Sequence, residues 1–196
     1  MLEKFEMYKL LPKDKRNELE NRVDAFFQEK NIKLNEKIDI TGVCNNLGIR
    51  VLSLSFPPSL DEQVHGIIFV DGDDKRIGVN SGLDTRAARF VVAHELAHYI
   101  TDITLSSRKK NQFAYADSHF DSAEKPDVER EMDYMAAAIL VRKDELEEDL
   151  KVLNISGIKS MDDVSAINQR MIEMLAERFN VKEDVIRRRI YEVACE

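Results

Sequence analysis

The stretch "RFVVAHELAHYITD", residues 89–102, decides how the rest of the chain is interpreted. Its aliphatic and aromatic residues predict a buried helix. The same stretch carries two histidines and a glutamate, where a core helix normally carries apolar side chains. Buried imidazole and carboxylate groups are costly unless they are paired. A shared cation removes that cost, so the stretch predicts a helix that faces a metal ion.

The spacing of His94, Glu95 and His98 is that of an HExxH motif. Residues four apart lie on one face of a helix, about 6 Å apart along its axis, so both imidazoles can reach one ion. Glu95 can reach a water molecule beside that ion and is the expected general base. Two core histidines satisfied by hydrogen bonds are the competing interpretation, which the apolar flanks disfavour.

A catalytic zinc ion normally has three protein ligands, so one more is required. The segment "EREMDYMAAAIL", residues 129–140, predicts a second helix with Glu129 and Asp133 on one face. We expect Glu129 to be the third ligand and Asp133 to accept the remaining ring N–H of a histidine ligand. An acidic first turn exposed to solvent is the alternative. The three alanines at 136–138 favour the ligand hypothesis, because they allow another helix to approach closely.

Around these two helices the sequence predicts an α+β fold, with a small antiparallel or mixed sheet, the zincin-type HExxH helix and surrounding helices. "VHGIIFV" and "RIGVN" flank "DGDDK", which is typical of a β-hairpin. Asp84 is the expected N-cap of the HExxH helix. The expected divisions are an N-terminal helical extension (1–37), a metallopeptidase core (38–150) and a C-terminal helical region packed on the core (151–196).

Composition limits the classes of partner. The net charge of −8 argues against broad binding of nucleic acid. The sequence contains no apolar run of about 18 residues and no secretion signal, so we expect a cytoplasmic protein without a membrane segment. Cys44 and Cys195 show no metal-binding spacing and are expected to be free thiols.

Three segments together resemble the ImmA/IrrE family of zinc metallopeptidases: "HGIIFVDGDDKRIGVN", "RFVVAHELAHYI" and "EREMDYMAAAIL". The resemblance extends from about residue 38 onward. It implies an intracellular endopeptidase with one Zn²⁺ per chain, Mn²⁺ being the alternative metal. His94, His98 and Glu129 would be the ligands, Glu95 the base and Asp133 the partner of a ligand. The implied substrate is a helix-turn-helix transcriptional repressor, whose cleavage derepresses a mobile element, prophage or stress regulon.

The sequence leaves the remaining substrate contacts open. The tetrahedral oxyanion usually needs a donor besides the metal. Tyr134, Tyr99, Tyr115 and His119 are the candidates by proximity in sequence, and we carry Tyr134 forward. We also expect the strand "HGIIFV" to present an exposed edge, where Gly66 lets an extended substrate approach as an added strand.

Three other functions compete with the peptidase. One is a non-proteolytic antirepressor module that binds the repressor on the same fold; retention of function in Glu95→Gln would identify it. Another is a DNA-reading helix that places the arginines at 187–189 on phosphates, although a solvated basic helix end explains them better. The third is a hydrolase of small amides, with the long segment 103–126 as a lid.

Overall fold

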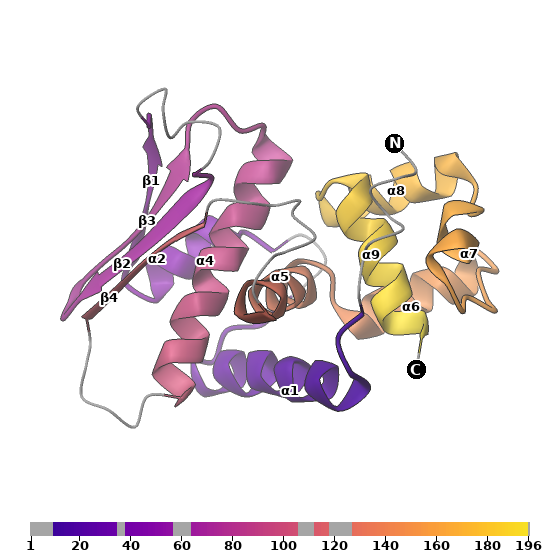
Figure 1. Ribbon diagram of the computed structural model, residues 1–196, viewed down its shortest axis with the longest axis horizontal. Helices are drawn as coiled ribbons and strands as arrows, with labels where there is room; N and C mark the ends of the chain where they lie inside the picture. The colour runs from indigo at the N-terminus through magenta and orange to yellow at the C-terminus, as the bar shows by residue number, and fades with distance from the viewer. Residues whose placement is uncertain (1–9, 35–37, 57–63, 106–111, 118–126, 196) are drawn as a thin grey trace.

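A four-stranded sheet lies on one side of the molecule and the helices lie on the other (Figure 1). The computed structural model describes residues 10–34, 38–56, 64–105, 112–117 and 127–195, and the side chains of 103–105 and 112–117 are not described. The strands are β1 (Ile49–Leu54), β2 (Gly66–Asp71), β3 (Asp74–Asn80) and β4 (Gln112–Asp117), in the order β1-β3-β2-β4. β1 pairs in parallel with β3, whereas β2 is antiparallel to both β3 and β4. The predicted α+β class with a small mixed sheet is confirmed.

The HExxH helix, α4 (Thr85–Leu105), packs on the sheet against β2 and β3. Its first turn is held by Asp84, whose carboxylate accepts a hydrogen bond from the Ala87 N–H at 2.9 Å, as expected for an N-cap. The side chains of Ile68 and Val70 in β2 are buried on the face towards α4, while Phe69 points to the other face and is 40% exposed.

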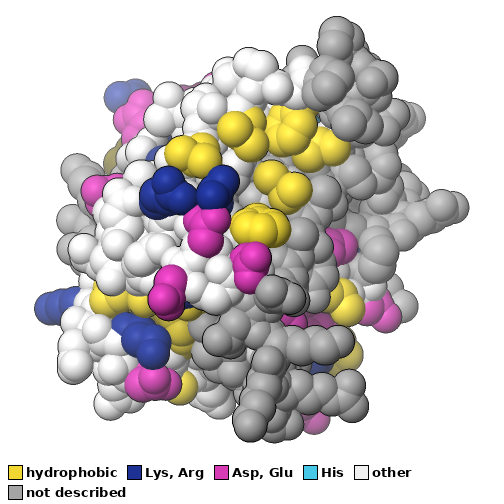
Figure 2. Space-filling view, turned by 90° about the vertical axis from the view of Figure 1, so that its left-hand side faces the viewer, with side chains coloured by type: hydrophobic (Ala, Val, Ile, Leu, Met, Phe, Trp, Pro, Cys, Tyr) yellow, Lys and Arg dark blue, Asp and Glu magenta, His cyan; other side chains and the backbone are white. Residues whose placement is uncertain are grey.

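The outer face of the sheet carries an apolar surface (Figure 2). Leu52, Leu54, Ile67 and Phe69 surround Gly78 in a shallow depression there. A Cβ atom on Gly78 would lie 2.3 Å from Leu54 Cδ1, so glycine is needed to let the neighbouring leucine lie flat on the strand. This depression lies on the face opposite α4 and takes no part in the HExxH site.

Two helices from the N-terminal part of the chain pack on the core, and α1 (Lys13–Glu29) lies along its lower side in Figure 1. In α1, an apolar stripe of Leu19, Val23, Phe26 and Phe27 is buried, and the helix packs on α4 and on α5 (Asp127–Leu140). α2 (Ile40–Asn46) ends before Gly48, whose φ of 73° is the left-handed conformation expected at that position.

The C-terminal third forms four helices beside α5: α6 (Lys143–Val152), α7 (Met161–Ser165), α8 (Gln169–Phe179) and α9 (Glu183–Ala194). Residues 180–182 connect α8 to α9, and α8 packs one face on α9. Met174 is 52% exposed, whereas Ile172 and Ala176 are buried. No helix among the described residues is long and apolar enough to cross a membrane.

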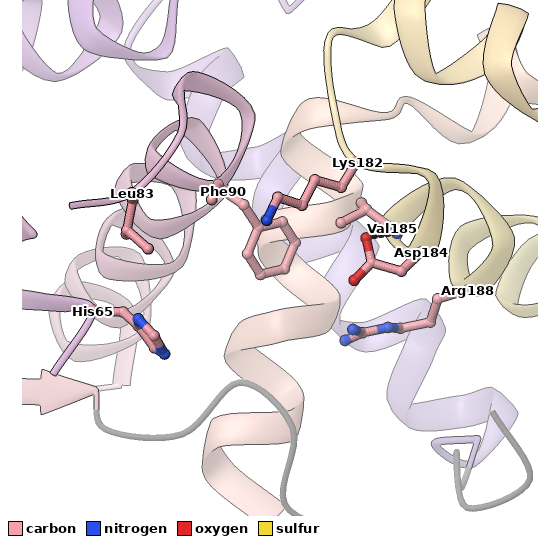
Figure 3. Close-up of a pocket in the computed structure, with 8 residues that line it drawn as sticks. His65, Leu83, Phe90, Lys182, Asp184, Val185 and Arg188 are labelled. Carbon is pink, nitrogen blue, oxygen red and sulfur yellow. Dashed lines mark hydrogen bonds between the residues drawn. The ribbon is translucent and has the colours of Figure 1, made fainter. Parts of the chain in front are cut away.

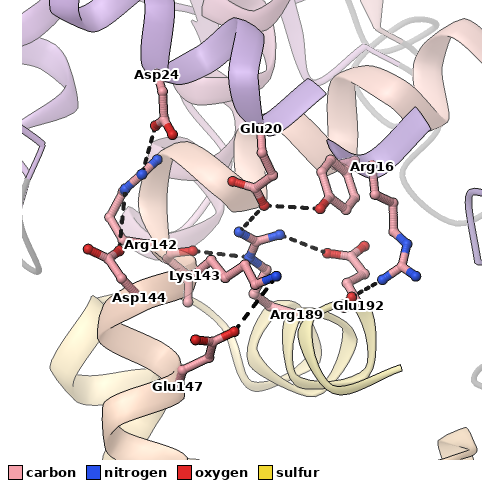
Figure 4. Close-up of polar contacts among 11 residues, drawn as sticks. Arg16, Glu20, Asp24, Arg142, Lys143, Asp144, Glu147, Arg189 and Glu192 are labelled. Carbon is pink, nitrogen blue, oxygen red and sulfur yellow. Dashed lines mark hydrogen bonds and ion pairs between the residues drawn. The ribbon is translucent and has the colours of Figure 1, made fainter. Parts of the chain in front are cut away.

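A buried charged cluster joins α1, α5 and α9 (Figure 4). Arg189 of α9 is fully buried and pairs with Glu20 of α1 and with Glu192 of its own helix, at 3.7 Å from the latter. Its guanidinium also donates to the Val141 carbonyl at 3.1 Å. Tyr134 of α5 donates its hydroxyl to the same Glu20 carboxylate at 3.0 Å, and its ring lies 5.3 Å from the guanidinium. The three helices are therefore held together by polar contacts as well as by apolar packing.

Candidate metal centre

Three potential ligands from α4 and α5 converge at one point. One donor atom from each of His94, His98 and Glu129 lies within 4.8 Å of the others. The two histidines are one helical turn apart on α4, with ring centroids 5.1 Å apart, as their spacing predicts. Both imidazoles are buried, while the Glu129 side chain is 23% exposed and forms the open side of the group.

The spacing of these atoms fits a metal ion. Glu129 Oε2 lies 3.0 Å from His94 Nε2 and 3.4 Å from His98 Nε2. Ligand atoms about 2.0–2.1 Å from a tetrahedral zinc ion lie about 3.3 Å from one another, so these contacts have the separations of a ligand set. Two imidazoles and one carboxylate are also a donor set that zinc favours. The residues present therefore fit the metal that the sequence predicts.

The Glu129 carboxyl group is held in its ionised form. Burial alone would raise its pKa, but hydrogen bonds from His94 and His98 outweigh burial and hold the pKa well below its usual range. The carboxylate is the form that binds a metal ion, so the two histidines keep Glu129 in the form that a metal site requires.

Asp133 orients one of the histidines. Its Oδ1 lies 2.9 Å from His94 Nδ1, so this ring nitrogen donates to the carboxylate. With the Nδ1 proton held by Asp133, Nε2 is the nitrogen that would bind a metal ion once the ion replaces the proton that Nε2 donates to Glu129. A carboxylate behind a ligating histidine is the usual arrangement in zinc sites, where it fixes the tautomer and raises the basicity of the ligand.

Glu95 lies next to this group, against the sheet. The residue is fully buried and follows His94 directly on α4. Gly66 of β2 leaves the space for it, because a Cβ atom at this position would lie 2.7 Å from Glu95 Oε1 and 2.4 Å from Val91 Cγ1. The absence of a side chain at Gly66 of β2 therefore makes room for the Glu95 carboxylate.

Comparison with known proteins assigns the family. The family described as Peptidase_M78, IrrE N-terminal-like domain, matches residues 44–191, about three quarters of the chain. The chain belongs to this family. Within this family, which is described as a peptidase family, His94, His98 and Glu129 form a group that could hold a metal ion. α1 precedes the part that matches the family.

A solved structure has a similar fold. It is described as a Mycobacterium tuberculosis transcriptional regulator and superposes with a TM-score of 0.55 at 18% sequence identity. The match covers 90% of this chain and 48% of that one, so the chain spans about half the length of the solved relative. No curated protein matches the sequence.

The prediction that "HGIIFV" presents an exposed edge is wrong, because β2 is not an edge strand. Gly66 pairs with Val79 of β3 on one side and with Asp117 of β4 on the other, so an added strand cannot reach it. β4 was not predicted, because "QFAYAD" lies within a long polar segment and is ordered as a strand by its pairing with β2. The structure gives Gly66 a different role, the accommodation of Glu95.

Two of the four candidate oxyanion donors, Tyr134 and Tyr99, have their described contacts away from the metal centre. Tyr134 donates to Glu20 in the charged cluster instead. Tyr99 packs edge-on against Phe26 at 6.3 Å. The Tyr115 backbone pairs with Ile68 in the sheet, but its side chain lies outside the described residues, as does the whole of His119.

The three arginines of α9 all contact other residues of the protein, and Arg189 is fully buried. Arg187 donates to the Val164 carbonyl at 3.1 Å and to Gln169 at 2.7 Å, and Arg189 belongs to the buried cluster. These contacts occupy two of the guanidinium groups that the DNA-reading hypothesis placed on phosphates. Arg188 lies 3.5 Å from Asp133 Oδ2 and is linked through it to His94. Sequence reasoning missed this link, because no local pattern relates α9 to α5.

Proposed function

We propose that the chain is a zinc-dependent endopeptidase that cleaves a helix-turn-helix transcriptional repressor in the cytoplasm, and thereby derepresses a mobile element, prophage or stress regulon. The observation that carries the peptidase proposal is the convergence of His94, His98 and Glu129, with Glu95 beside them. The choice of a repressor is supported by the family resemblance and by the likeness in fold to a transcriptional regulator.

The residues of the chain have distinct parts in the mechanism. His94, His98 and Glu129 would hold the ion, which when bound polarises a peptide carbonyl and acidifies water. Glu95 accepts the proton of the attacking water and passes it to the leaving amine as the peptide bond breaks. Asp133 keeps the His94 ring in one orientation throughout. Because Glu95 is buried against β2, its carboxylate needs little reorganisation during the reaction.

We infer that the substrate lies along β4 rather than β2. In the described sheet β4 is the outer strand beside β2, and its Asp117 pairs with Gly66, which lies against Glu95. An extended peptide added to the outer edge of β4 would run past the metal centre, with its backbone held by hydrogen bonds. Deletion of a β4 residue, which shifts the register, is expected to abolish cleavage while the bound zinc is retained.

Metal content is the first test, measured by elemental mass spectrometry on the wild type, Glu129→Ala, Glu95→Gln and Glu131→Ala. Glu131 is the matched control because it lies on the same helix and pairs with Lys15 at 3.3 Å. We expect about one equivalent of zinc in all except Glu129→Ala. A wild type that takes up no zinc when zinc is supplied would refute the peptidase proposal.

Cleavage of a candidate repressor is the second test. Zinc-loaded wild type and Glu131→Ala are expected to cut it, whereas Glu95→Gln, which keeps the metal, is expected to be inactive. If Glu95→Gln releases the repressor from its operator as well as the wild type does, the protein acts as a non-proteolytic antirepressor.

A further inference from the structure

A second cavity lies between the start of α4 and the start of α9 (Figure 3). Its volume is about 200 Å³. Leu83, Ala87 and Phe90 form one wall and Val185 forms part of the other, with His65 at the end nearer the sheet. Lys182, Asp184 and Arg188 complete the side formed by α9.

Two residues that line the cavity, Phe90 and Arg188, relate it to the metal centre. Phe90 precedes His94 by four residues on the same face of α4, a separation of about 6 Å along the helix axis. Arg188 lines the cavity and also faces Asp133, the partner of His94. An extended peptide advances about 3.3 Å per residue. A side chain one or two residues from the scissile bond can therefore reach the cavity.

The size of the cavity indicates a single side chain as its occupant. Binding sites for small molecules usually measure about 300–1,000 Å³, which is more than this cavity provides. A protein substrate that lies across the metal centre needs room for only one large side chain beside the bond that is cut. The volume therefore favours a peptide substrate over a small amide.

The chemistry of the walls favours an apolar side chain. The two cations of the α9 side already face carboxylates: Lys182 pairs with Asp84 at 3.0 Å, and Arg188 faces Asp133. An acidic side chain would have to compete with these pairs and would also meet Asp184. A basic side chain would meet the two cations. Contact with the aliphatic and aromatic wall, in contrast, stabilises a bound apolar side chain in proportion to the apolar area that it buries.

We propose that this cavity is the subsite for a large apolar side chain of the peptide substrate close to the scissile bond, and that Ala87 and Val185 set the size it accepts. This inference rests on the proposed peptidase function. It gives α9 a second role, since the helix that faces Asp133 also forms one wall of the subsite. The substrate class is then a polypeptide with leucine, methionine or phenylalanine at one fixed position.

The test is a cleavage-site profile on a peptide library, read by mass spectrometry, for zinc-loaded wild type, Ala87→Leu, Val185→Ala and Thr85→Leu. Thr85 is the matched control because it is exposed on the same helix and does not line the cavity. Ala87→Leu should lower the ratio of kcat/KM for large over small residues at one position about tenfold, and Val185→Ala should shift the preference towards larger residues. Thr85→Leu should keep the wild-type profile.

Two other outcomes are decisive in different ways. Wild-type cleavage with profiles that do not change in Ala87→Leu and Val185→Ala overturns the subsite while the peptidase stands. If zinc-loaded wild type cuts no peptide and none binds to Glu95→Gln by calorimetry, the proposed function fails and the subsite fails with it. Zinc content and circular dichroism of each variant exclude loss of the metal or of the fold as the cause.

Discussion

Arg188 and Asp133 join the C-terminal helices to the metal centre: Nη1 of the arginine lies 3.5 Å from Oδ2 of the aspartate, whose Oδ1 lies 2.9 Å from His94 Nδ1. The Arg188 side chain is only 16% exposed and that of Asp133 only 7%, so solvent screens this contact weakly. The orientation of a metal-ligating histidine depends on the carboxylate behind it. The packing of α9 therefore affects the orientation of the His94 ring, which belongs to α4.

The first prediction concerns this contact. Arg188→Met is expected to lower zinc affinity about tenfold, because Asp133 loses the cation that holds its second oxygen. Arg188→Lys should keep most of the affinity, since it retains the charge. The measurement is competition with a zinc chelator at constant pH. Arg187→Met is the control, as its contacts are with Val164 and Gln169. Equal zinc affinity in Arg188→Met and wild type would contradict the prediction.

The second prediction concerns pH and the start of α4. The Ala87 N–H and the Lys182 ammonium group donate to Asp84 and lower the pKa of its carboxyl group from the ordinary value of 3.8. A carboxyl group whose pKa is lowered in the folded state stabilises the protein at pH values above the ordinary pKa of that group. This stabilisation is lost as the pH falls through the lowered pKa. Asp84→Ala should therefore lower the free energy of unfolding by about 1 kcal/mol at pH 7 and by less below pH of about 4.

Urea unfolding of wild type, Asp84→Ala and Asp84→Asn at several pH values tests this. Asparagine still caps a helix but carries no charge, so Asp84→Asn should keep most of the stability without the acid-dependent part. The same difference between wild type and Asp84→Ala at pH 7 and at low pH would show that Asp84 does not titrate as described.

The HExxH site was predictable from the sequence because it depends on helix periodicity. His94 and His98, like Glu129 and Asp133, are four residues apart, and this spacing alone puts each pair on one face. The structure brings the two faces together, with Glu129 3.0 Å from His94. What the spacing could not supply is any contact that depends on how distant helices pack, such as that between Arg188 and Asp133.

The error about β2 has one cause. "QFAYAD" alternates like a strand, but it stands within a polar segment without other signals, so the sequence indicated no partner for the second edge of "HGIIFV". The pairing of β2 with β4 depends on residues more than forty positions apart, which local patterns do not reveal.

The third prediction concerns the buried cluster around Arg189. Arg189→Met should lower the free energy of unfolding by about 3–5 kcal/mol, because it leaves Glu20 and Glu192 without their buried cation. Arg178→Met is the comparison: this arginine is 39% exposed and pairs with Asp149, so the loss should be at most about 1 kcal/mol. Urea unfolding followed by circular dichroism measures both. Similar losses in the two variants would mean that the cluster contributes no more than a surface pair.

The last prediction concerns the two free thiols. Burial, with the nearby charge of Asp39, raises the pKa of the Cys44 thiol to about 12, and the residue lies on the buried face of α2. Burial raises the pKa of Cys195 as well, but this residue is partly exposed at the end of α9. Because the thiolate is the reactive form, iodoacetamide at pH 8 should alkylate Cys195 first in the native protein and leave Cys44 intact until urea unfolds the chain. In the Cys195→Ser variant, only Cys44 can be alkylated, so mass spectrometry of the alkylated protein reports the opening of α2 alone. In the wild type, equal alkylation rates for the two cysteines in native buffer would contradict the burial of Cys44.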